Sequence, residues 1–206
     1  MISRRSTLAL GAALVAGTAI SALAVEYNQF RLAARLDGDL LHVSAPNFRF
    51  LTGKALDRLN DGASVAFIAQ LTVSRSPSYL LPDATSTARF VISKDIWEDR
   101  FSVTQLGDRP NQKHTQSGMS ASAAEAWCFD KLAVNRSDIP ADRPFYLQVD
   151  LRVEDPRDQA GFVGENGISI KRLLEIASQP PRDKQVRWLL NSGPLRVEDL
   201  LKGMHG

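Results

Sequence analysis

Cysteine is almost absent from this chain. Cys128 is the single cysteine among 206 residues, so no disulfide can link two parts of the chain. It follows Trp127 in an apolar helical pattern, and free cysteines are among the most buried residue types. A nucleophilic cysteine needs a polarising histidine, and nothing in the sequence pairs one with Cys128. We therefore expect an unreactive buried thiol and a fold that is held together by its core.

Histidine is scarce as well, and its spacing fits no zinc motif. His42, His114 and His205 lie far apart in the sequence, and none belongs to a helical H-x-x-x-H pair. We expect His42 to be an exposed strand residue, His114 to lie in a loop and His205 to lie in the C-terminal tail. The sequence predicts no metal site and no cofactor.

Motifs for nucleotide binding, calcium binding and ester hydrolysis are missing too. The spacing of Gly161, Gly164 and Gly167 fits neither G-x-G-x-x-G nor the P-loop. The oxygen-rich segment 155–166 lacks the spacing of a calcium-binding loop. No G-x-S-x-G elbow is present, so Ser192 is interpreted as a turn residue. No residue is therefore predicted to be catalytic, cofactor-binding or metal-binding.

The body of the chain has no excess of either charge. The 25 basic and 23 acidic residues give a formal charge of +2. Arg4 and Arg5 lie in the first 24 residues, where no acid occurs, so the rest of the chain is neutral overall. A neutral body argues against an extended nucleic-acid surface. A hydrophobic content of 44% and a charged content of 23% are typical of a globular domain.

Residues 1–24 have the three parts of an export signal. Arg4 and Arg5 form a basic start, and residues 6–25 carry no charge. Ala22 and Ala24 then form a small-x-small site of the kind that signal peptidase cuts. The alternative is a membrane anchor that stays attached, because about 20 apolar residues can span a bilayer.

The basic start also resembles the twin-arginine export motif, with Leu8 downstream of the paired arginines. Thr7 replaces the usual phenylalanine, so the match is partial. Whichever route is used, positive residues stay on the cytoplasmic side of the membrane. We therefore expect the body to lie across the inner membrane, in the periplasm or another extracytoplasmic space, free or anchored by residues 6–25.

The stretch 145–154, with the sequence FYLQVDLRVE, alternates apolar and polar side chains. This period of two predicts a half-buried strand, because successive side chains in a strand point to opposite faces. Val149 and Leu151 are expected to face the core, and Asp150 and Arg152 to face water.

Further strands are predicted by the same alternation. The stretches from residue 65 to residue 105 follow one another without room for crossover helices, which favours an antiparallel meander. The polar segment 106–118 predicts a loop, and 191–194 predicts a turn. The predicted strands cover 40–45, 65–74, 84–94, a stretch from Phe101 and a short last strand or helix over 185–190.

The clearest helix is predicted over 120–132. Ser122 and Glu125 have the spacing of a capping box. Trp127 is expected to anchor the helix in the core, within a stripe that includes Ala124 and Cys128. Shorter helices are predicted after Thr52, over 168–177 and over 195–202.

Together these elements predict an α+β fold. We expect a curved antiparallel β-sheet of five to six strands with one main helix packed on a face and shorter helices at its ends. A β-sandwich with inserted helices is the alternative. A single domain is expected over 36–202, after a lead-in or tether over 25–35.

Large apolar side chains occur in two segments where polar ones are usual. Tyr79, Leu80 and Leu81 lie at the tip of a predicted turn, and Trp97 lies in a short connector. Exposed, they would form a contact for a partner or a membrane surface. Folded back, they would cover the edge of the core, and this is the arrangement that we expect.

The body resembles DUF4390, a bacterial family known only as a domain of unknown function. The resemblance covers roughly residues 36–200, and the order and spacing of short motifs carry it. It implies a small exported or membrane-anchored domain and brings no catalytic residues. The matching motifs are Ala55-Leu56 with Gly62 and Val65-x-Phe67, Phe101-x-Val103, the helix around Ala124, the strand from Phe145 to Val153, and Trp188-Leu189 followed by Ser192.

Two functions are open at this point. The first is a non-enzymatic binding or assembly module of the bacterial envelope, whose partner is an envelope protein or a lipid-like ligand beneath the helix. The second is a hydrolase-like enzyme with a dispersed site of aspartates and glutamates, which would require convergent carboxylates in a deep pocket.

Overall fold

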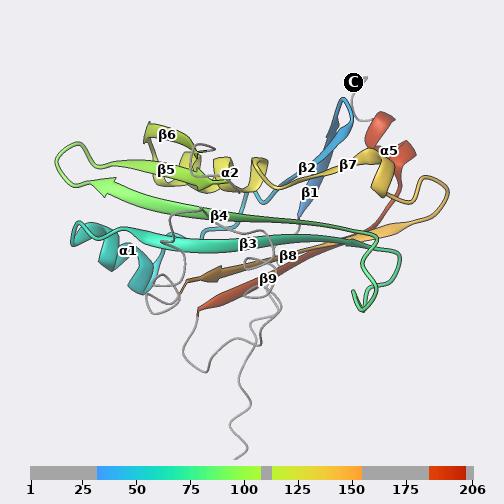
Figure 1. Cartoon of the computed structure of the whole chain (residues 1–206), viewed down its shortest axis with the longest axis horizontal. Helices are drawn as coiled ribbons and strands as arrows, with labels where there is room; N and C mark the ends of the chain where they lie inside the picture. Colours follow the sequence, from blue (N-terminus) through green and yellow to red (C-terminus); the bar gives the residue numbers. More distant parts are fainter. Residues whose placement is uncertain (1–31, 108–112, 155–185, 203–206) are drawn as a thin grey trace, which may run out of the picture.

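The computed structural model describes residues 32–107, 113–154 and 186–202 (Figure 1). These residues form a three-stranded and a six-stranded antiparallel sheet with a few helices, so the fold is α+β, as predicted. The export segment 1–24, the loop 155–167, the predicted helix 168–177 and His205 lie outside the described residues. Within the described residues no helix is long and apolar enough to cross a membrane.

The larger sheet has the strand order β6-β5-β4-β3-β8-β9. All neighbours are antiparallel, which confirms the predicted meander from β3 to β5. β3 and β8 pair directly with Leu71 opposite Val149, so the two alternating stretches share one apolar face. The strands are β3 (Val65–Ser74), β4 (Ala84–Asp95), β5 (Arg100–Leu106), β6 (Lys113–Met119), β8 (Phe145–Val153) and β9 (Arg187–Leu195).

The smaller sheet consists of β1 (Ala33–Asp37), β2 (Leu40–Ser44) and β7 (Ala133–Asn135), in that order. β1 and β2 form a hairpin whose turn contains Gly38 at a φ of +57°, a conformation that glycine adopts without strain. β1 takes up residues 33–35 of the expected lead-in or tether, so a strand precedes the first one predicted, which was expected over 40–45. The apolar alternation of β1 is too short to be recognised in the sequence.

The core lies between the apolar face of the larger sheet, the smaller sheet and α2 (Ala121–Asp130). Figure 1 shows α2 and the smaller sheet on the same side of the larger sheet. Phe50 is fully buried there and meets Phe67 edge to face, with ring centroids 5.0 Å apart. Edge-to-face contacts of this kind add to the stability that apolar burial provides.

α2 is confirmed as the main helix, but its predicted cap and anchor are wrong. Ser120 rather than Ser122 caps the helix, because its hydroxyl accepts a hydrogen bond from the backbone N–H of Ala123. Trp127 is only partly buried, packed edge to face on Phe90. Phe129 is the aromatic residue of α2 that is buried in the core.

The other helices are short. α1 (Gly53–Asn60) begins after Thr52, as predicted, although the Thr52 side chain makes no capping hydrogen bond. α5 (Val197–Lys202) is the predicted C-terminal helical turn, and η1 (Arg136–Asp138) is a single 3₁₀ turn after β7.

Two predicted loops belong to strands. The segment 106–118 was expected to be a loop, but β6 (Lys113–Met119) pairs with β5 through its backbone while most of its side chains stay exposed. The expected turn over 191–194 is part of β9, which continues to Leu195 across a register shift. Both segments lack the apolar alternation by which strands are recognised.

β8 shows where the prediction of a half-buried strand holds and where it fails. Val149 and Leu151 are buried in the core, as predicted. Asp150 and Arg152 on the opposite face were expected to contact water, yet their residues are only 7% and 3% exposed. We call this opposite face of the larger sheet its outer face.

Candidate functional site

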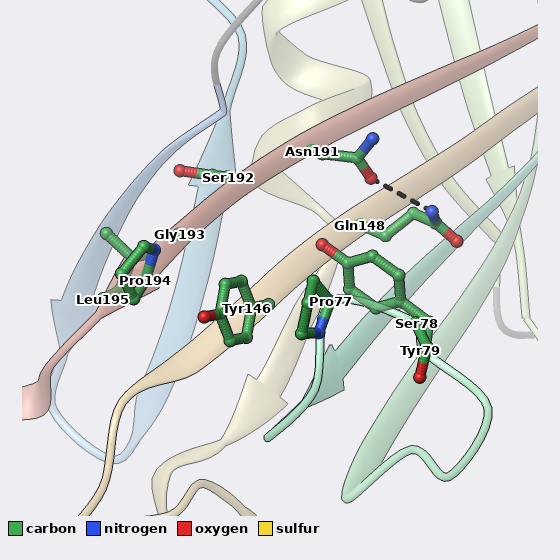
Figure 2. Close-up of a pocket in the computed structure, with 10 residues that line it drawn as sticks. All are labelled: Pro77, Ser78, Tyr79, Tyr146, Gln148, Asn191, Ser192, Gly193, Pro194 and Leu195. Atoms are coloured by element: carbon green, nitrogen blue, oxygen red, sulfur yellow. Dashed lines mark hydrogen bonds between the residues drawn. The ribbon is translucent and has the colours of Figure 1, made fainter.

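A groove lies where the β3–β4 loop meets β8 and β9 (Figure 2). Its volume is about 720 Å³, within the range of roughly 300–1,000 Å³ for sites that hold small ligands. We call it the tyrosine groove. Its lining residues are Pro77, Ser78, Tyr79, Tyr146, Gln148, Asn191, Ser192, Gly193, Pro194 and Leu195.

The floor of the tyrosine groove carries a pair of side-chain amides. Gln148 of β8 and Asn191 of β9 lie opposite each other, and Gln148 Nε2 donates to Asn191 Oδ1 at 3.0 Å (Figure 2). Two amides carry four N–H donors in total, and this bond uses one of them. In the described part of the chain, neither amide makes another side-chain hydrogen bond. The remaining donors can therefore bind oxygen atoms of a ligand.

Tyr79 forms one wall of the groove and is held in place by the fold. Its hydroxyl donates to the carbonyl oxygen of Leu147 at 2.9 Å, which ties the β3–β4 loop to β8. The base of the loop is closed by Arg75 and Asp83, whose Nη2 and Oδ1 atoms lie 2.6 Å apart. Ser74 Oγ also donates to the carbonyl oxygen of Leu81 at 3.2 Å. The wall is thus preorganised, so binding requires little further ordering.

Tyr146, near the start of β8, forms part of the groove lining. Its ring has room there because residue 193 is a glycine. A Cβ atom on Gly193 would lie 2.9 Å from Tyr146 Cδ1 and 2.9 Å from the carbonyl oxygen of Phe145. Gly193 also has a φ of +128°, which side-chain-bearing residues rarely adopt. Glycine at this position therefore lets the tyrosine ring pack directly against the β9 backbone.

We use the name rim for Leu80 and Leu81, the two apolar residues that come next in the chain after the lining residue Tyr79. Leu80 and Leu81 follow Tyr79 directly and are 81% and 85% exposed. Trp97, in the β4–β5 turn at the opposite end of β4, is 91% exposed. The expectation that these residues fold back on the core is wrong for all three, and only Tyr79 is half-buried. The β3–β4 turn is anchored by Tyr79, so the two leucines that follow it extend into water.

Beyond Gln148, charged residues of β8 and of the neighbouring strands bind one another on the outer face of the larger sheet. The guanidinium of Arg89 on β4 donates to Glu154 Oε2 from Nε at 2.8 Å, and its Nη2 lies 2.7 Å from the same oxygen. Asp150 accepts hydrogen bonds from Arg152 and, in a two-bond arrangement, from Arg187. Buried charges persist in proteins when they are paired in this way. We call these five residues the ion-pair cluster.

A third carboxylate, that of Glu125, is buried on the core side of the larger sheet. Its Oε1 accepts hydrogen bonds from the backbone N–H groups of Phe50 at 2.7 Å and Leu51 at 2.8 Å. Its Oε2 lies 3.5 Å from Arg49 Nε. Burial raises the pKa of Glu125, and the two N–H groups and Arg49 partly offset this effect. The predicted capping-box role of Glu125 is wrong: it joins α2 to the 45–52 segment.

The single cysteine has the environment that was predicted. Cys128 is buried and free, and burial raises the pKa of its thiol far above the ordinary value. It packs with Phe50 and Leu151 beneath α2, where the remaining gaps are too small to hold a water molecule.

The histidines are placed differently from the prediction. His42 is half-buried, and its Nδ1 lies 2.8 Å from the carbonyl oxygen of Asp130, so the prediction of an exposed residue is wrong. His114 lies in β6 rather than in a loop, and it is exposed. The described residues contain no group of three or more His, Cys, Asp or Glu side chains that could hold a metal ion. The glycines at 161, 164 and 167 and the segment 155–166 lie outside the described residues.

Sequence reasoning missed the groove itself. Tyr146 and Gln148 were interpreted as ordinary water-facing residues of a strand, and Ser192 as a turn residue. The sequence did show a tyrosine and an amide on the polar face of a strand. The partner of Gln148, Asn191, is 43 positions away, and only strand pairing brings the two amides together.

Comparison with known proteins adds no assignment to this geometry. No family model matches the chain, and no curated protein or solved structure matches it either.

Proposed function

We propose that this chain is an exported or membrane-anchored domain of the bacterial envelope that binds a partner without catalysing a reaction, and that the tyrosine groove is its binding surface. The single observation that carries the proposal is the groove's lining. Among the described residues, this lining combines aromatic rings, prolines, amides and hydroxyls, and contains no Asp, Glu, His, Cys, Lys or Arg. General acid–base catalysis needs a group that titrates near the working pH, whereas recognition needs apolar surface and a few directed hydrogen bonds.

The location of the bound partner follows from the available volumes. The space beneath α2 has no room even for a water molecule, whereas small-ligand sites begin at roughly 300 Å³. The tyrosine groove, at about 720 Å³, lies within the range of such sites and opens to solvent. We therefore place the ligand at the groove rather than beneath the helix.

The alternative, a hydrolase with a dispersed carboxylate site, has less support. Asp150 and Glu154 are each bound by arginine side chains, and Glu125 is bound by two backbone N–H groups. These carboxylates fulfil structural roles in the described part of the chain. None of them lines the tyrosine groove.

The export half of the proposal rests on residues 1–24, including Arg4, Arg5, Ala22 and Ala24, and agrees with the resemblance to DUF4390. It is tested by fractionating cells and sequencing the N-terminus of the mature protein. We expect the body outside the cytoplasm, with a new N-terminus after Ala24 or with residues 6–25 retained in the membrane. Recovery of the body in the cytoplasm would overturn this half.

The binding half is tested by photo-crosslinking in cells. A crosslinking amino acid at Leu80, on the rim of the groove, is expected to give one discrete product of higher mass. The same amino acid at Trp97 is the matched control, because that residue is also an exposed apolar group in a turn but lies at the other end of β4. Absence of a product at Leu80, or the same product at both positions, would contradict a binding role for the groove.

A further inference from the structure

We propose that the tyrosine groove takes an extended, uncharged, proline-containing peptide segment of a protein partner. This inference rests on the proposed function, and it adds the chemical class of the ligand. It is carried by three features of the groove: its neutral lining, its ring-bearing walls and its apolar rim.

The neutral lining selects against charged ligands. The ten lining residues contain no side chain that is charged at neutral pH. A charged group brought into the groove would lose hydration without gaining an opposite charge. An uncharged segment loses much less, because its amides and carbonyls can bind the groove's own polar groups.

The walls present four rings to a ligand. Tyr79 and Tyr146 provide two aromatic rings, and Pro77 and Pro194 provide two prolyl rings (Figure 2). Grooves lined by aromatic rings bind polyproline-type segments, which are extended before binding and therefore lose little entropy. The fixed wall at Tyr79 adds to this advantage, since its hydroxyl is bound to Leu147.

The floor supplies hydrogen-bond donors at the place where such a segment exposes acceptors. A polyproline-type helix makes no internal hydrogen bonds, so its carbonyl oxygens all remain available. Gln148 and Asn191 keep three of their four N–H donors after their mutual bond. Proline contributes carbonyl oxygens and no N–H, which matches a floor that is rich in donors.

The exposed leucines of the rim favour a peptide over a neutral glycan as the ligand. A sugar chain could also stack on tyrosines and accept hydrogen bonds from amides. Leu80 and Leu81 nevertheless come directly after the lining residue Tyr79 in the chain and are exposed, and a sugar has no apolar side chain to cover them. A peptide whose flanking residues are apolar covers both leucines while its prolines occupy the groove.

The experiment measures binding of fluorescently labelled synthetic peptides to the full chain by anisotropy. The probe is an end-capped hexapeptide that alternates alanine, proline and leucine. The comparison ligands are the same peptide with serine in place of proline, the same peptide with two glutamates, and an uncharged oligosaccharide used as a competitor. We expect saturable binding of the proline peptide and at least about tenfold weaker binding of each altered peptide, a difference of about 1.4 kcal/mol.

Two variants place the peptide in the groove. Tyr146→Ala and Asn191→Ala are each expected to weaken binding by about tenfold, as for a residue at the centre of an interface. Trp97→Ala is the control and should bind normally. Circular dichroism establishes that each variant is folded, and two variants on different strands guard against a local defect in one of them.

The inference is overturned if the proline peptide fails to bind, or if the oligosaccharide binds and displaces it. A crosslinked product at Leu80 in cells together with no binding of the proline peptide would remove the ligand class and leave the proposed function intact. Failure of both experiments would remove both.

Discussion

The polar side chains at the two ends of β8 have opposite environments. At one end of the outer face, Asp150 and Arg152 are buried and bind neighbouring charges. At the other end, Tyr146 and Gln148 are half-buried, neutral and lined up along an open groove. The strand is continuous, so the difference comes from the side chains and from what covers them.

The comparison shows how a polar residue can be assigned a structural or a binding role. A charge that is removed from water costs several kcal/mol, so it occurs where the fold itself supplies a partner, as in the ion-pair cluster. A neutral amide costs less to leave half-covered, so Gln148 and Asn191 can keep unused donors at the surface. Glu125 follows the first rule inside the core, with backbone N–H groups as its partners.

The largest effect on stability is expected at the end of β8 where the charged side chains are buried. Replacing Glu154 by alanine leaves the guanidinium of Arg89 buried without this carboxylate, at a cost of about 3–5 kcal/mol in the free energy of unfolding. The double variant Arg89→Met with Glu154→Leu should lose much less than the sum of the single variants. Chemical denaturation at pH 7 measures all of these values. Additive losses would show that the pair is not coupled.

A somewhat smaller effect is expected at Glu125. Alanine there leaves the N–H groups of Phe50 and Leu51 buried without an acceptor, which should cost at least about 2 kcal/mol at roughly 1–3 kcal/mol for each unsatisfied group. Glu125→Gln keeps an acceptor oxygen and should stay within about 1 kcal/mol of the parent protein. Equal losses for both variants would show that the hydrogen bonds to Oε1 are not what stabilises this contact.

Side-chain alternation was sufficient to predict the sheet and its core. The stretch 145–154 alternates along its length and 65–74 is apolar at every second position, and both became strands at the predicted positions. β6 was missed because its residues are polar on both faces, so only its backbone shows that it is a strand. α2 was predicted as an element, but Phe129 rather than Trp127 reaches the core.

The binding surface could not be predicted by the same reasoning. Its lining comes from segments around residues 77–79, 146–148 and 191–195, which meet only through the pairing of β8 with β9 and the return of the β3–β4 loop. Nothing local in Gln148 distinguishes it from a solvent-facing strand residue. The burial of Asp150 could not be predicted either. The alternation of side chains along a strand shows which face each one occupies, but it does not show whether that face is covered.

The pH dependence of stability provides a further test of how buried carboxylates behave. Burial raises the folded-state pKa of Glu125 above its ordinary value of 4.5, so the folded protein binds this proton more tightly than the unfolded chain does. The contribution of Glu125 to stability therefore falls as the pH rises from the unfolded pKa through the folded pKa. Glu125→Gln cannot titrate, so the parent protein should lose stability relative to it between about pH 4 and neutral pH. A constant difference in unfolding free energy across this range would contradict the raised pKa.

Smaller effects on stability are expected at the other end of β8, which lines the tyrosine groove. Gln148→Ala removes a half-buried amide whose bonded partner, Asn191, can turn to water, so the free energy of unfolding should change by less than about 1 kcal/mol. Thermal unfolding followed by circular dichroism measures this change. A loss as large as that of the Glu154 variant would show that the groove is part of the structural framework.

The smallest effect is expected at the rim. Leu80→Ser together with Leu81→Ser exchanges two exposed side chains that contribute nothing to the core, so stability should stay within about 0.5 kcal/mol of the parent protein. The same double variant should lower the yield of the crosslinked product when the crosslinker is placed at Ser78 instead. A large loss of stability would mean that the leucines fold back on the core.

One measurement tests most directly whether the open end of β8 is a binding surface. The crosslinker is placed at Leu80, and the yield of the product in cells is compared with and without Tyr146→Ala. The account predicts that the yield falls strongly while the amount of folded protein stays unchanged. A product that persists without the Tyr146 ring, or a protein that no longer folds, would contradict it.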